Sequence, residues 1–258
     1  MMITFDNVSF SYSSDSSVFT NLRIGIEARS KVLIVGRNGA GKSTFLRLLN
    51  GILHPTGGSV SVNGFLTSDH PTSRLAAEAS VTFQNPSHQL FASTVQSEAE
   101  FAPKSLGREN PRDLAHQALQ LFHLDAQAKS HPYDLSLAGR KLLSLASAAA
   151  SAAPILAFDE PSVNLSRPEQ QILIDGLDTL HNKGTTLLLV SHDLELFLPH
   201  CTHVLILQGG GATFYDSPLE LLHNQTLLRR SGVRLPLVHR LRPHYGLTEF
   251  PESAPGKA

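Results

Sequence analysis

Apolar and polar residues alternate in two stretches of the amino-terminal part of the chain. These are ITFDNVSFSY at residues 3–12 and GSVSVNGFLT at residues 58–67. A period of two is typical of strands that bury one face and expose the other. Within the second stretch, Asn63-Gly64 is a strong signal for the tight turn of a hairpin. The pattern therefore predicts antiparallel strands in this part of the chain.

Short, uninterrupted apolar runs dominate the second half of the chain. They are ILAF (155–158), TTLLLV (185–190) and HVLIL (203–207), and helical stretches separate them. Strands buried on both faces of a parallel sheet have this appearance. A glycine-rich turn followed by a final strand is predicted for QGGGATFYD (208–216). The pattern thus predicts a mainly parallel sheet here.

Helical signals replace strand signals in the middle of the chain. The stretch NPRDLAHQALQLFHL (110–124) predicts a helix capped by Asn110, with Pro111 in its first turn. The face predicted to be buried carries Leu114, Ala118, Leu121 and Phe122. We therefore expect a helical subdomain at about residues 85–150, inserted into an α/β domain that spans residues 1–220.

Composition narrows the class of protein. A chain of 258 residues with 41% hydrophobic residues buries a substantial core, and a net charge of -1 gives no basic field that would attract nucleic acid. The single cysteine, Cys201, cannot form an internal disulfide and fits a reducing compartment. The start lacks signal-peptide features, and serines and Pro154 interrupt the most apolar segment, residues 142–158. We expect a cytoplasmic protein that meets a membrane only through a partner.

The clearest chemical motif is GRNGAGKST at residues 36–44, between the apolar run KVLIV and a helical stretch. It completes the pattern G-x-x-x-x-G-K-S/T of a P-loop. Lys42 can reach the β- and γ-phosphates of a nucleotide, and the hydroxyl of Ser43 can bind Mg²⁺. The glycines Gly36, Gly39 and Gly41 let the main chain turn tightly, so that its N–H groups can face an anion.

Acidic residues follow the apolar run ILAF, where a parallel sheet places functional groups. Asp159 can hold Mg²⁺ through water, and Glu160 can polarise an attacking water molecule. His192 follows the run TTLLLV and is expected at the same edge of the sheet. The thirteen histidines show no spacing typical of metal ligands, so no transition-metal site is predicted.

Taken in order, these motifs resemble the nucleotide-binding subunits of ATP-binding-cassette (ABC) transporters. Further matches are Tyr12 in SFSY, similar to the aromatic residue that stacks on adenine, and Gln84 in VTFQNP, similar to the Q-loop glutamine. DLSLAGRK (134–141) stands where the family has its signature motif. The P-loop, ILAFDEPSVNLS and His192 are similar to the family's Walker A motif, its Walker B motif with the D-loop, and its switch histidine.

The resemblance implies an α/β fold with a P-loop NTPase core, a mixed, mostly parallel sheet, an antiparallel β subdomain and an inserted α-helical subdomain. It implies that ATP and Mg²⁺ are bound, with Glu160 as general base, His192 contacting the γ-phosphate, and Gln84 sensing that phosphate through metal or water. Ser43, Gln84 and Asp159 are the implied metal-site residues. Implied nucleotide-binding residues are Tyr12, Gly36, Asn38, Gly39, Gly41, Lys42, Ser43, Thr44, Ser136 and Gly139.

The segment from Phe83 to Gly107 resembles energy-coupling-factor (ECF) ATPases and their cobalt and nickel relatives, which drive uptake of vitamins or metal ions. The implied partners are a second ABC ATPase subunit, a transmembrane T subunit and a small substrate-binding membrane subunit, with no nucleic acid. The implied location is the cytoplasmic face of the membrane. One alternative is that this segment only packs the helical subdomain. The others are that the chain is the ATPase of a different ABC transporter, a soluble non-transport ABC protein or a weakly hydrolysing regulatory subunit.

Departures from the family fall at groups that act between subunits. The family signature is Leu-Ser-Gly-Gly-Gln, but Leu137 and Ala138 replace its glycines and hinder both close approach and any positive φ. In the D-loop, Ser166 stands where Asp is usual, and Asn164 where Gly or Ala is commoner. These changes favour a heterodimer with two unequal sites, and a slow homodimer is the alternative.

The carboxy-terminal extension, residues 221–258, is the one region of charge asymmetry. Its first 28 residues contain no Asp or Glu; its basic residues include Arg229, Arg230, Arg234, Arg240 and Arg242. Three interpretations stay open: a solvated helix surface, a dimerisation segment, or an electrostatic contact with an anionic membrane face.

Overall fold

The amino-terminal part of the chain forms an antiparallel sheet. In this computed structural model, which describes residues 1–13, 16–83 and 89–231, the strand order is β2-β1-β4-β5. Asn63 and Gly64 have φ values of 48° and 84°, as the predicted hairpin turn requires. The antiparallel strands predicted from residues 3–12 and 58–67 are confirmed as β1 Ile3–Ser13, β4 Gly57–Val62 and β5 Phe65–Leu66. Strand β2, Ser16–Ile26, was not predicted.

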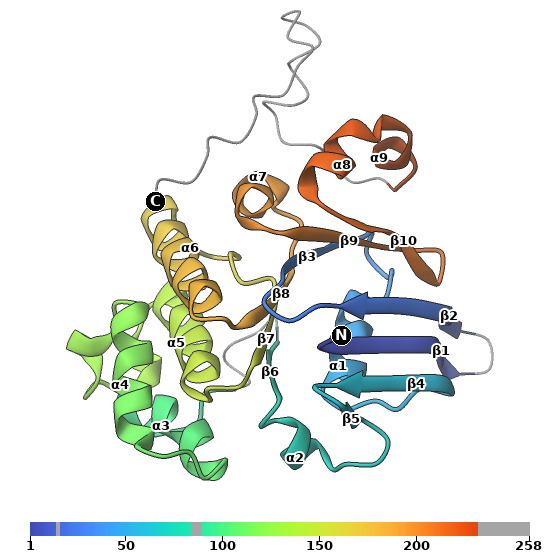
Figure 1. Ribbon diagram of the computed structural model, residues 1–258. Helices are drawn as coiled ribbons and strands as arrows, with labels where there is room; N and C mark the ends of the chain where they lie inside the picture. The colour runs from blue at the N-terminus through green and yellow to red at the C-terminus, as the bar shows by residue number, and fades with distance from the viewer. Residues whose placement is uncertain (14–15, 84–88, 232–258) are drawn as a thin grey trace, which may run out of the picture.

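A second sheet runs through the centre of the molecule (Figure 1), in the order β10-β9-β3-β8-β7-β6. Neighbouring strands are parallel except for β10, which pairs antiparallel with β9. Its strands are β3 Lys31–Val35, β6 Ala79–Thr82, β7 Ile155–Asp159, β8 Thr186–Val190, β9 His203–Gln208 and β10 Gly211–Asp216. The strands predicted for this sheet are confirmed. Strand β6 was not predicted from the sequence, because it has only four residues.

Helix α1 (Lys42–Leu49) follows β3 and joins the two sheets. Its apolar residues share one buried cluster with residues of both sheets. The rings of Phe5 and Phe45 stack within it at a centroid distance of 4.2 Å. This packing fixes the amino-terminal end of α1 at the carboxyl ends of the central strands, where functional groups of parallel sheets gather.

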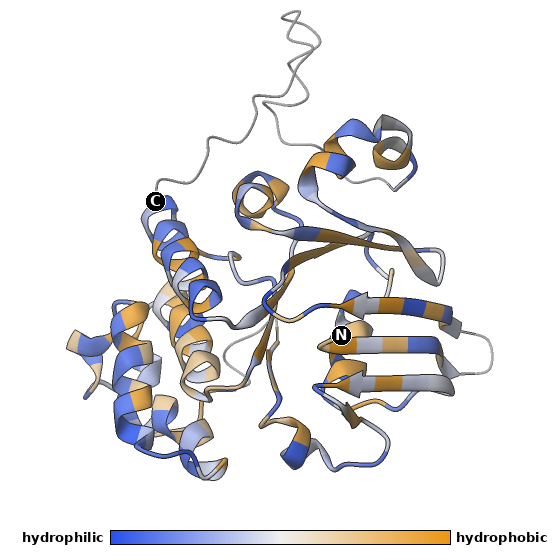
Figure 2. Ribbon diagram, viewed as in Figure 1, coloured by the Kyte–Doolittle hydropathy of each residue, from blue (hydrophilic) through white to orange (hydrophobic). Residues whose placement is uncertain are grey.

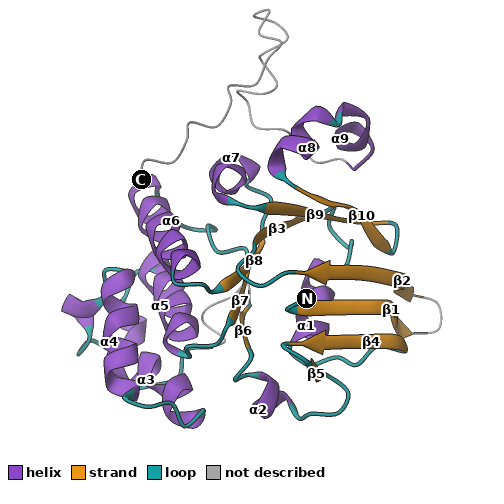
Figure 3. Ribbon diagram, viewed as in Figure 1, coloured by secondary structure: helices purple, strands orange, loops and turns teal. Residues whose placement is uncertain are grey.

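The helical insertion lies between β6 and β7 in sequence and forms its own group beside the central sheet (Figure 3). It consists mainly of α3 (Val95–Ser105), α4 (Pro111–Leu121) and α5 (Leu137–Ala150), which pack against one another. The remaining helices are α2 Thr72–Leu75, α6 Arg167–Asn182, α7 Leu194–Phe197, α8 Pro218–His223 and α9 Gln225–Ser231.

The predicted buried face of α4 is partly wrong. The structure buries Ala115, Ala118, Leu119 and Phe122, whereas Leu114 and Leu121 are only half-buried. The reason is that α4 packs against both α3 and α5, which rotates its buried face toward Ala115 and Leu119. Asn110 is the cap residue as predicted, but it has a φ of 50° and its side chain makes no capping hydrogen bond.

The central strands β3, β7 and β8 are apolar along most of their length (Figure 2), and their residues are buried. Within the part of the chain that the structure describes, none of the helices combines the length and hydropathy that a membrane crossing needs.

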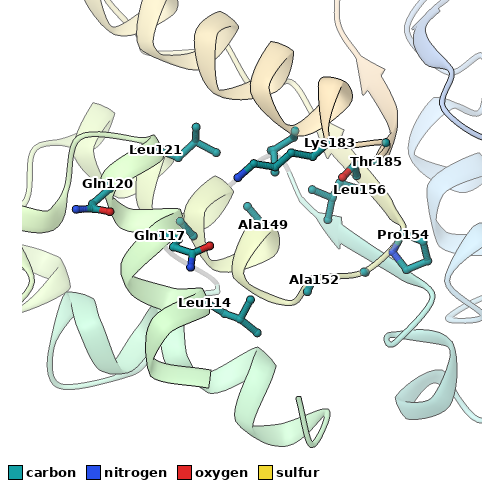
Figure 4. A pocket seen from close by; sticks show the side chains of 14 residues that line it. Leu114, Gln117, Gln120, Leu121, Ala149, Ala152, Pro154, Leu156, Lys183 and Thr185 are labelled. Carbon is teal, nitrogen blue, oxygen red and sulfur yellow. The ribbon is translucent and has the colours of Figure 1, made fainter. Parts of the chain in front are cut away.

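A cavity of about 800 Å³ lies between α4 and the carboxyl ends of α5 and α6 (Figure 4). Leu114 and Leu121 line one side, and Lys183 lines the other. Pro154 and Thr185, which directly precede β7 and β8, also line it. The cavity therefore opens at the amino-terminal ends of these strands, at the opposite edge of the sheet from the predicted site.

Candidate active site

The P-loop connects β3 to α1, and its glycines are needed for different reasons. Gly39 and Gly41 have φ values of 81° and 92°, which side-chain-bearing residues rarely adopt. A Cβ atom at Gly36 would lie 2.5 Å from the carbonyl oxygen of Leu207, and one at Gly41 would lie 2.7 Å from the Phe19 ring. The loop is therefore held tightly between β2 and β9.

Lys42 is buried inside this loop. Its ammonium donates hydrogen bonds to the carbonyl oxygens of Gly36 at 2.7 Å and Arg37 at 3.3 Å. Burial lowers the pKa of Lys42, while the carboxylates of Glu160 and Asp159 act in the opposite direction. The cation is thus positioned within the loop and faces an acidic partner across the site.

Ser43 and Asp159 meet at the base of the site. The Ser43 hydroxyl donates to Oδ2 of Asp159 at 2.9 Å. Hydroxyl and carboxylate oxygens are the hard ligands that Mg²⁺ prefers, and this ion is usually held by one or two protein oxygens together with phosphates and water. The residues present therefore fit a magnesium ion bound together with a nucleotide.

Glu160, the residue after strand β7, has an unusual left-handed backbone conformation. Its φ is 50°, and its N–H donates to the carbonyl of Val190 at 2.8 Å. The carboxylate lies 3.5 Å from Nε2 of His192 and accepts a hydrogen bond from the Ser191 hydroxyl at 3.4 Å. Burial raises the pKa of Glu160, His192 lowers it, and Asp159 raises it further. The structure brings together Glu160 and His192, which lie at the ends of adjacent strands.

Tyr12 lies at the side of the P-loop helix. Its hydroxyl is 3.1 Å from Oγ1 of Thr44, and its ring meets the edge of Phe10 at a centroid distance of 4.9 Å. The residue is 55% exposed, which leaves an aromatic surface beside the loop. An aromatic ring in this position can stack on a purine.

The sequence pattern of the family described as ABC transporter matches residues 19–163. The chain belongs to the ABC transporter family. It is 30% identical over 249 residues to the energy-coupling factor transporter ATP-binding protein EcfA of Methanothermobacter thermautotrophicus, covering 93% of this chain and 80% of that protein. As a member of this family, the ABC protein described here binds ATP and hydrolyses it.

Solved structures agree on the fold. The chain matches cbiO1 from Clostridium perfringens, part of the ABC transporter complex cbiONQ, with a TM-score of 0.79 and 21% identity, covering 94% of this chain and 98% of cbiO1. It also matches the dimeric ATP-binding cassette MJ0796 bound to ADP and Pi, with a TM-score of 0.76 and 23% identity, covering 84% of this chain and 99% of that cassette.

In this ABC protein the signature motif caps helix α5. The hydroxyl of Ser136 accepts a hydrogen bond from the N–H of Gly139 at 3.0 Å. Leu137 and Ala138 lie in the first helical turn, and neither has a positive φ. Leu137 is 60% exposed, so its side chain lies on the surface. Among the described residues, no hydrogen bond or ion pair joins Ser136 or Gly139 to the P-loop.

The altered D-loop residues have local roles in the ABC protein. Both the N–H and the hydroxyl of Ser166 donate to Oε2 of Glu169 at 2.6 Å, and these bonds lower the pKa of Glu169. Ser166 therefore caps α6, a position for which Asp is also well suited. Asn164 has a φ of 67°, which Asn tolerates better than most residues.

Gln84 and Lys141 differ from the other site residues: the structure does not describe the first, and the sequence did not predict the second. Gln84, the predicted Q-loop glutamine, lies outside the residues that the structure describes. Lys141 was missed: it is a buried lysine on α5 whose ammonium donates to the carbonyl oxygen of Asp159 at 3.3 Å. A lysine followed by the apolar run LLSLASAAA was the available signal.

Proposed function

We propose that this chain is the ATPase of an ECF-type importer, in which it powers uptake of a vitamin or a transition-metal ion. The similarity to EcfA over 93% of the chain is the observation that carries the proposal. The fold shared with cbiO1 supports it, because that protein is part of a transporter complex. Residues 1–220 form the ATP-binding domain, and residues 221–258 are an extension of it.

The proposed chemistry is attack of water on the γ-phosphorus of ATP. Lys42 and the P-loop N–H groups bind the phosphates, Ser43 and Asp159 hold magnesium, and Gln84 contributes to sensing the γ-phosphate. Magnesium, when bound, neutralises charge on the β- and γ-phosphates. Glu160 accepts the proton of the attacking water, since it is buried, has a raised pKa and lies at the end of the strand that carries Asp159.

His192 stands beside Glu160 and can donate from its imidazole to the γ-phosphate. Its pairing with Glu160 keeps the two groups together at the carboxyl ends of β7 and β8. Tyr12 stacks on the adenine, in keeping with its exposed ring beside Thr44. Positioning and charge account for this reaction because phosphoryl transfer needs little covalent chemistry from the protein.

Two ABC subunits form the working unit, with Ser136 and Gly139 of each serving the nucleotide bound by the other. The dimeric state of MJ0796 supports this arrangement. The exposed Leu137 favours a partner subunit of a different kind, because its side chain occupies the surface where the other subunit's nucleotide would approach. We therefore propose a heterodimer with unequal sites.

A transmembrane T subunit docks on the helical insertion and holds the chain at the cytoplasmic face of the membrane. Phe91 and Phe101 are 65% and 51% exposed, and their rings meet edge to face at 4.7 Å. Glu98 fixes the loop beneath them, since its carboxylate accepts from the N–H groups of Phe91 and Ala92. Phe91 precedes α3 and Phe101 lies within it, so the pair forms one exposed aromatic patch, and such patches are enriched in protein interfaces.

The decisive experiment is co-purification of the tagged chain from its native membranes in mild detergent. Recovery of a small substrate-binding membrane protein, a T-type membrane protein and a second ATPase subunit supports the proposal. A Phe91→Ser/Phe101→Ser variant should lose the membrane proteins and keep the ATPase partner, with Leu66→Ser as an exposed control outside the helical insertion. Recovery of ribosomes or DNA instead would replace transport with a soluble role. Robust cooperative ATP hydrolysis by the purified chain alone would replace the heterodimer with a homodimer.

A further inference from the structure

Lys141 carries a charge into the interior of the protein. It lies on α5, five residues after the signature serine Ser136, and is 2% exposed. Lysine is almost never buried so completely unless charged or polar groups compensate the loss of water. Burial lowers the pKa of Lys141 to about 8, and the carboxylates of Asp159 and Glu160 raise it. The acidic pair of the active site thus stabilises the buried cation.

One hydrogen bond of Lys141 acts on a particular peptide group. Its acceptor, the carbonyl of Asp159 at 3.3 Å, belongs to the peptide bond that joins Asp159 to Glu160. The N–H of the same peptide donates to the carbonyl of Val190 at 2.8 Å. Helix α5 and strand β8 therefore hold this peptide from two sides. It cannot rotate without breaking one of the two bonds.

Glu160 depends on these two hydrogen bonds for its backbone conformation. Glu160 has a φ of 50°, and this left-handed conformation is unfavourable for a residue with a Cβ atom. Such conformations persist where the surrounding structure leaves no alternative. The conformation decides where the Glu160 carboxylate lies, and it places that group 3.5 Å from the imidazole of His192.

We propose that Lys141 is a positioning residue, which holds the peptide between Asp159 and Glu160 so that the Glu160 carboxylate is aimed at the attacking water. This rests on the role proposed above for Glu160. The same helix begins at Ser136, whose motif serves the nucleotide bound by the other subunit. Helix α5 therefore connects the signature of one nucleotide site directly to the general base of the other.

The test compares Lys141→Met with the wild-type chain in the ATPase complex that it forms. Methionine matches the apolar stem of lysine, is one heavy atom shorter, and removes both the charge and the hydrogen-bond donor. We expect kcat to fall roughly 10- to 100-fold, because small misplacements of a reacting group have effects of this size. We expect KM for ATP and the affinity for a fluorescent ATP analogue to change less than about twofold, because the P-loop is not touched. Lys141→Arg, which retains charge and donor, should recover part of kcat.

A second measurement separates positioning from general damage. In single-turnover assays, Lys141→Met should slow the wild-type chain but cause little further loss in a Glu160→Gln background, since residues that act as a unit are not additive. Leu145→Met on the same helix controls for altered packing and should retain wild-type kcat. Thermal unfolding of every variant identifies loss of fold.

The outcomes are distinct. A folded Lys141→Met chain with wild-type kcat overturns the proposal, and so does an equal loss in both backgrounds or a matching loss of ATP affinity. If Lys141→Met does not fold, Lys141→Gln is judged by the same outcomes. Wild-type turnover in Glu160→Gln would refute the role of Glu160 itself; an inactive Glu160→Gln beside a fully active Lys141→Met refutes only the role of Lys141.

Discussion

Phe122 packs against the main chain of Gly176, and a Cβ atom at Gly176 would lie 2.9 Å from Cε1 of its ring. Phe122 follows α4 of the helical insertion, whereas Gly176 lies in the middle of α6. Both residues are buried. The contact therefore anchors the insertion on the α/β core, and it explains a glycine in a helix interior, where glycine is normally unfavourable.

Gly176→Ala should consequently destabilise the protein, although the same change usually stabilises a helix by up to about 1 kcal/mol. Overpacking costs roughly 1–3 kcal/mol, so we expect a net loss in the free energy of unfolding of about 1 kcal/mol, measured by chemical denaturation. Phe122→Leu should make the alanine tolerable, so the two changes together should cost less than the sum of each alone. A stabilised Gly176→Ala chain would contradict the contact.

Ser43 and Asp159 should both determine how strongly ATP hydrolysis depends on the magnesium concentration. Ser43→Ala removes the hydroxyl that Asp159 accepts at 2.9 Å and should raise the Mg²⁺ concentration needed for half-maximal ATPase activity at least about tenfold. Asp159→Asn should do the same and lower kcat further, because it also removes a charge. Thr44→Ser, which retains the hydroxyl beside Tyr12, is the matched control and should leave the Mg²⁺ dependence unchanged.

The pH dependence of ATP hydrolysis should report on Glu160. Its ionised form is the active one, and burial raises its pKa, so activity should fall on acidification at a higher pH than an ordinary glutamate would give. His192 lowers that pKa. His192→Ala should therefore move the acidic limb of the kcat/KM profile to still higher pH, whatever it does to the maximum rate. A limb that stays in place or moves to lower pH would show that another group titrates there.

The positions of the strands and motifs could be predicted because they depend on local patterns. Alternation, uninterrupted apolar runs and the turn at Asn63-Gly64 gave the order of the strands, and the P-loop glycines carry their conformational requirement in the sequence. Strands β2 and β6 were missed: four residues are too few to show a period in β6, and register shifts against β1 interrupt the alternation in β2. The buried face of α4 was partly wrong because neighbouring helices, rather than its own hydropathy, decide which side is covered.

The finer arrangement of the site depends on contacts between distant segments. The residues around Glu160 do not predict its positive φ, because hydrogen bonds from β8 and α5 hold the peptide group that precedes it. The role of Lys141 depends on how closely α5 approaches β7. Tertiary packing decides each of these features.

Cys201 provides a test of packing at the opposite edge of the sheet from the nucleotide site. Burial raises the pKa of its thiol to about 12, while Lys31 lowers it and Asp178 raises it. At pH 8, a rise from 9.0 to about 12 reduces the thiolate population about a thousandfold, and the thiolate is the reactive form. Iodoacetamide should therefore modify the native protein at least about 100-fold more slowly than the protein unfolded in urea. Asp178→Asn removes the carboxylate that raises this pKa, so it should speed the reaction of the native protein. Rapid labelling of the folded wild-type chain at pH 8 would contradict the prediction, because it would show that the thiol is accessible and ionised.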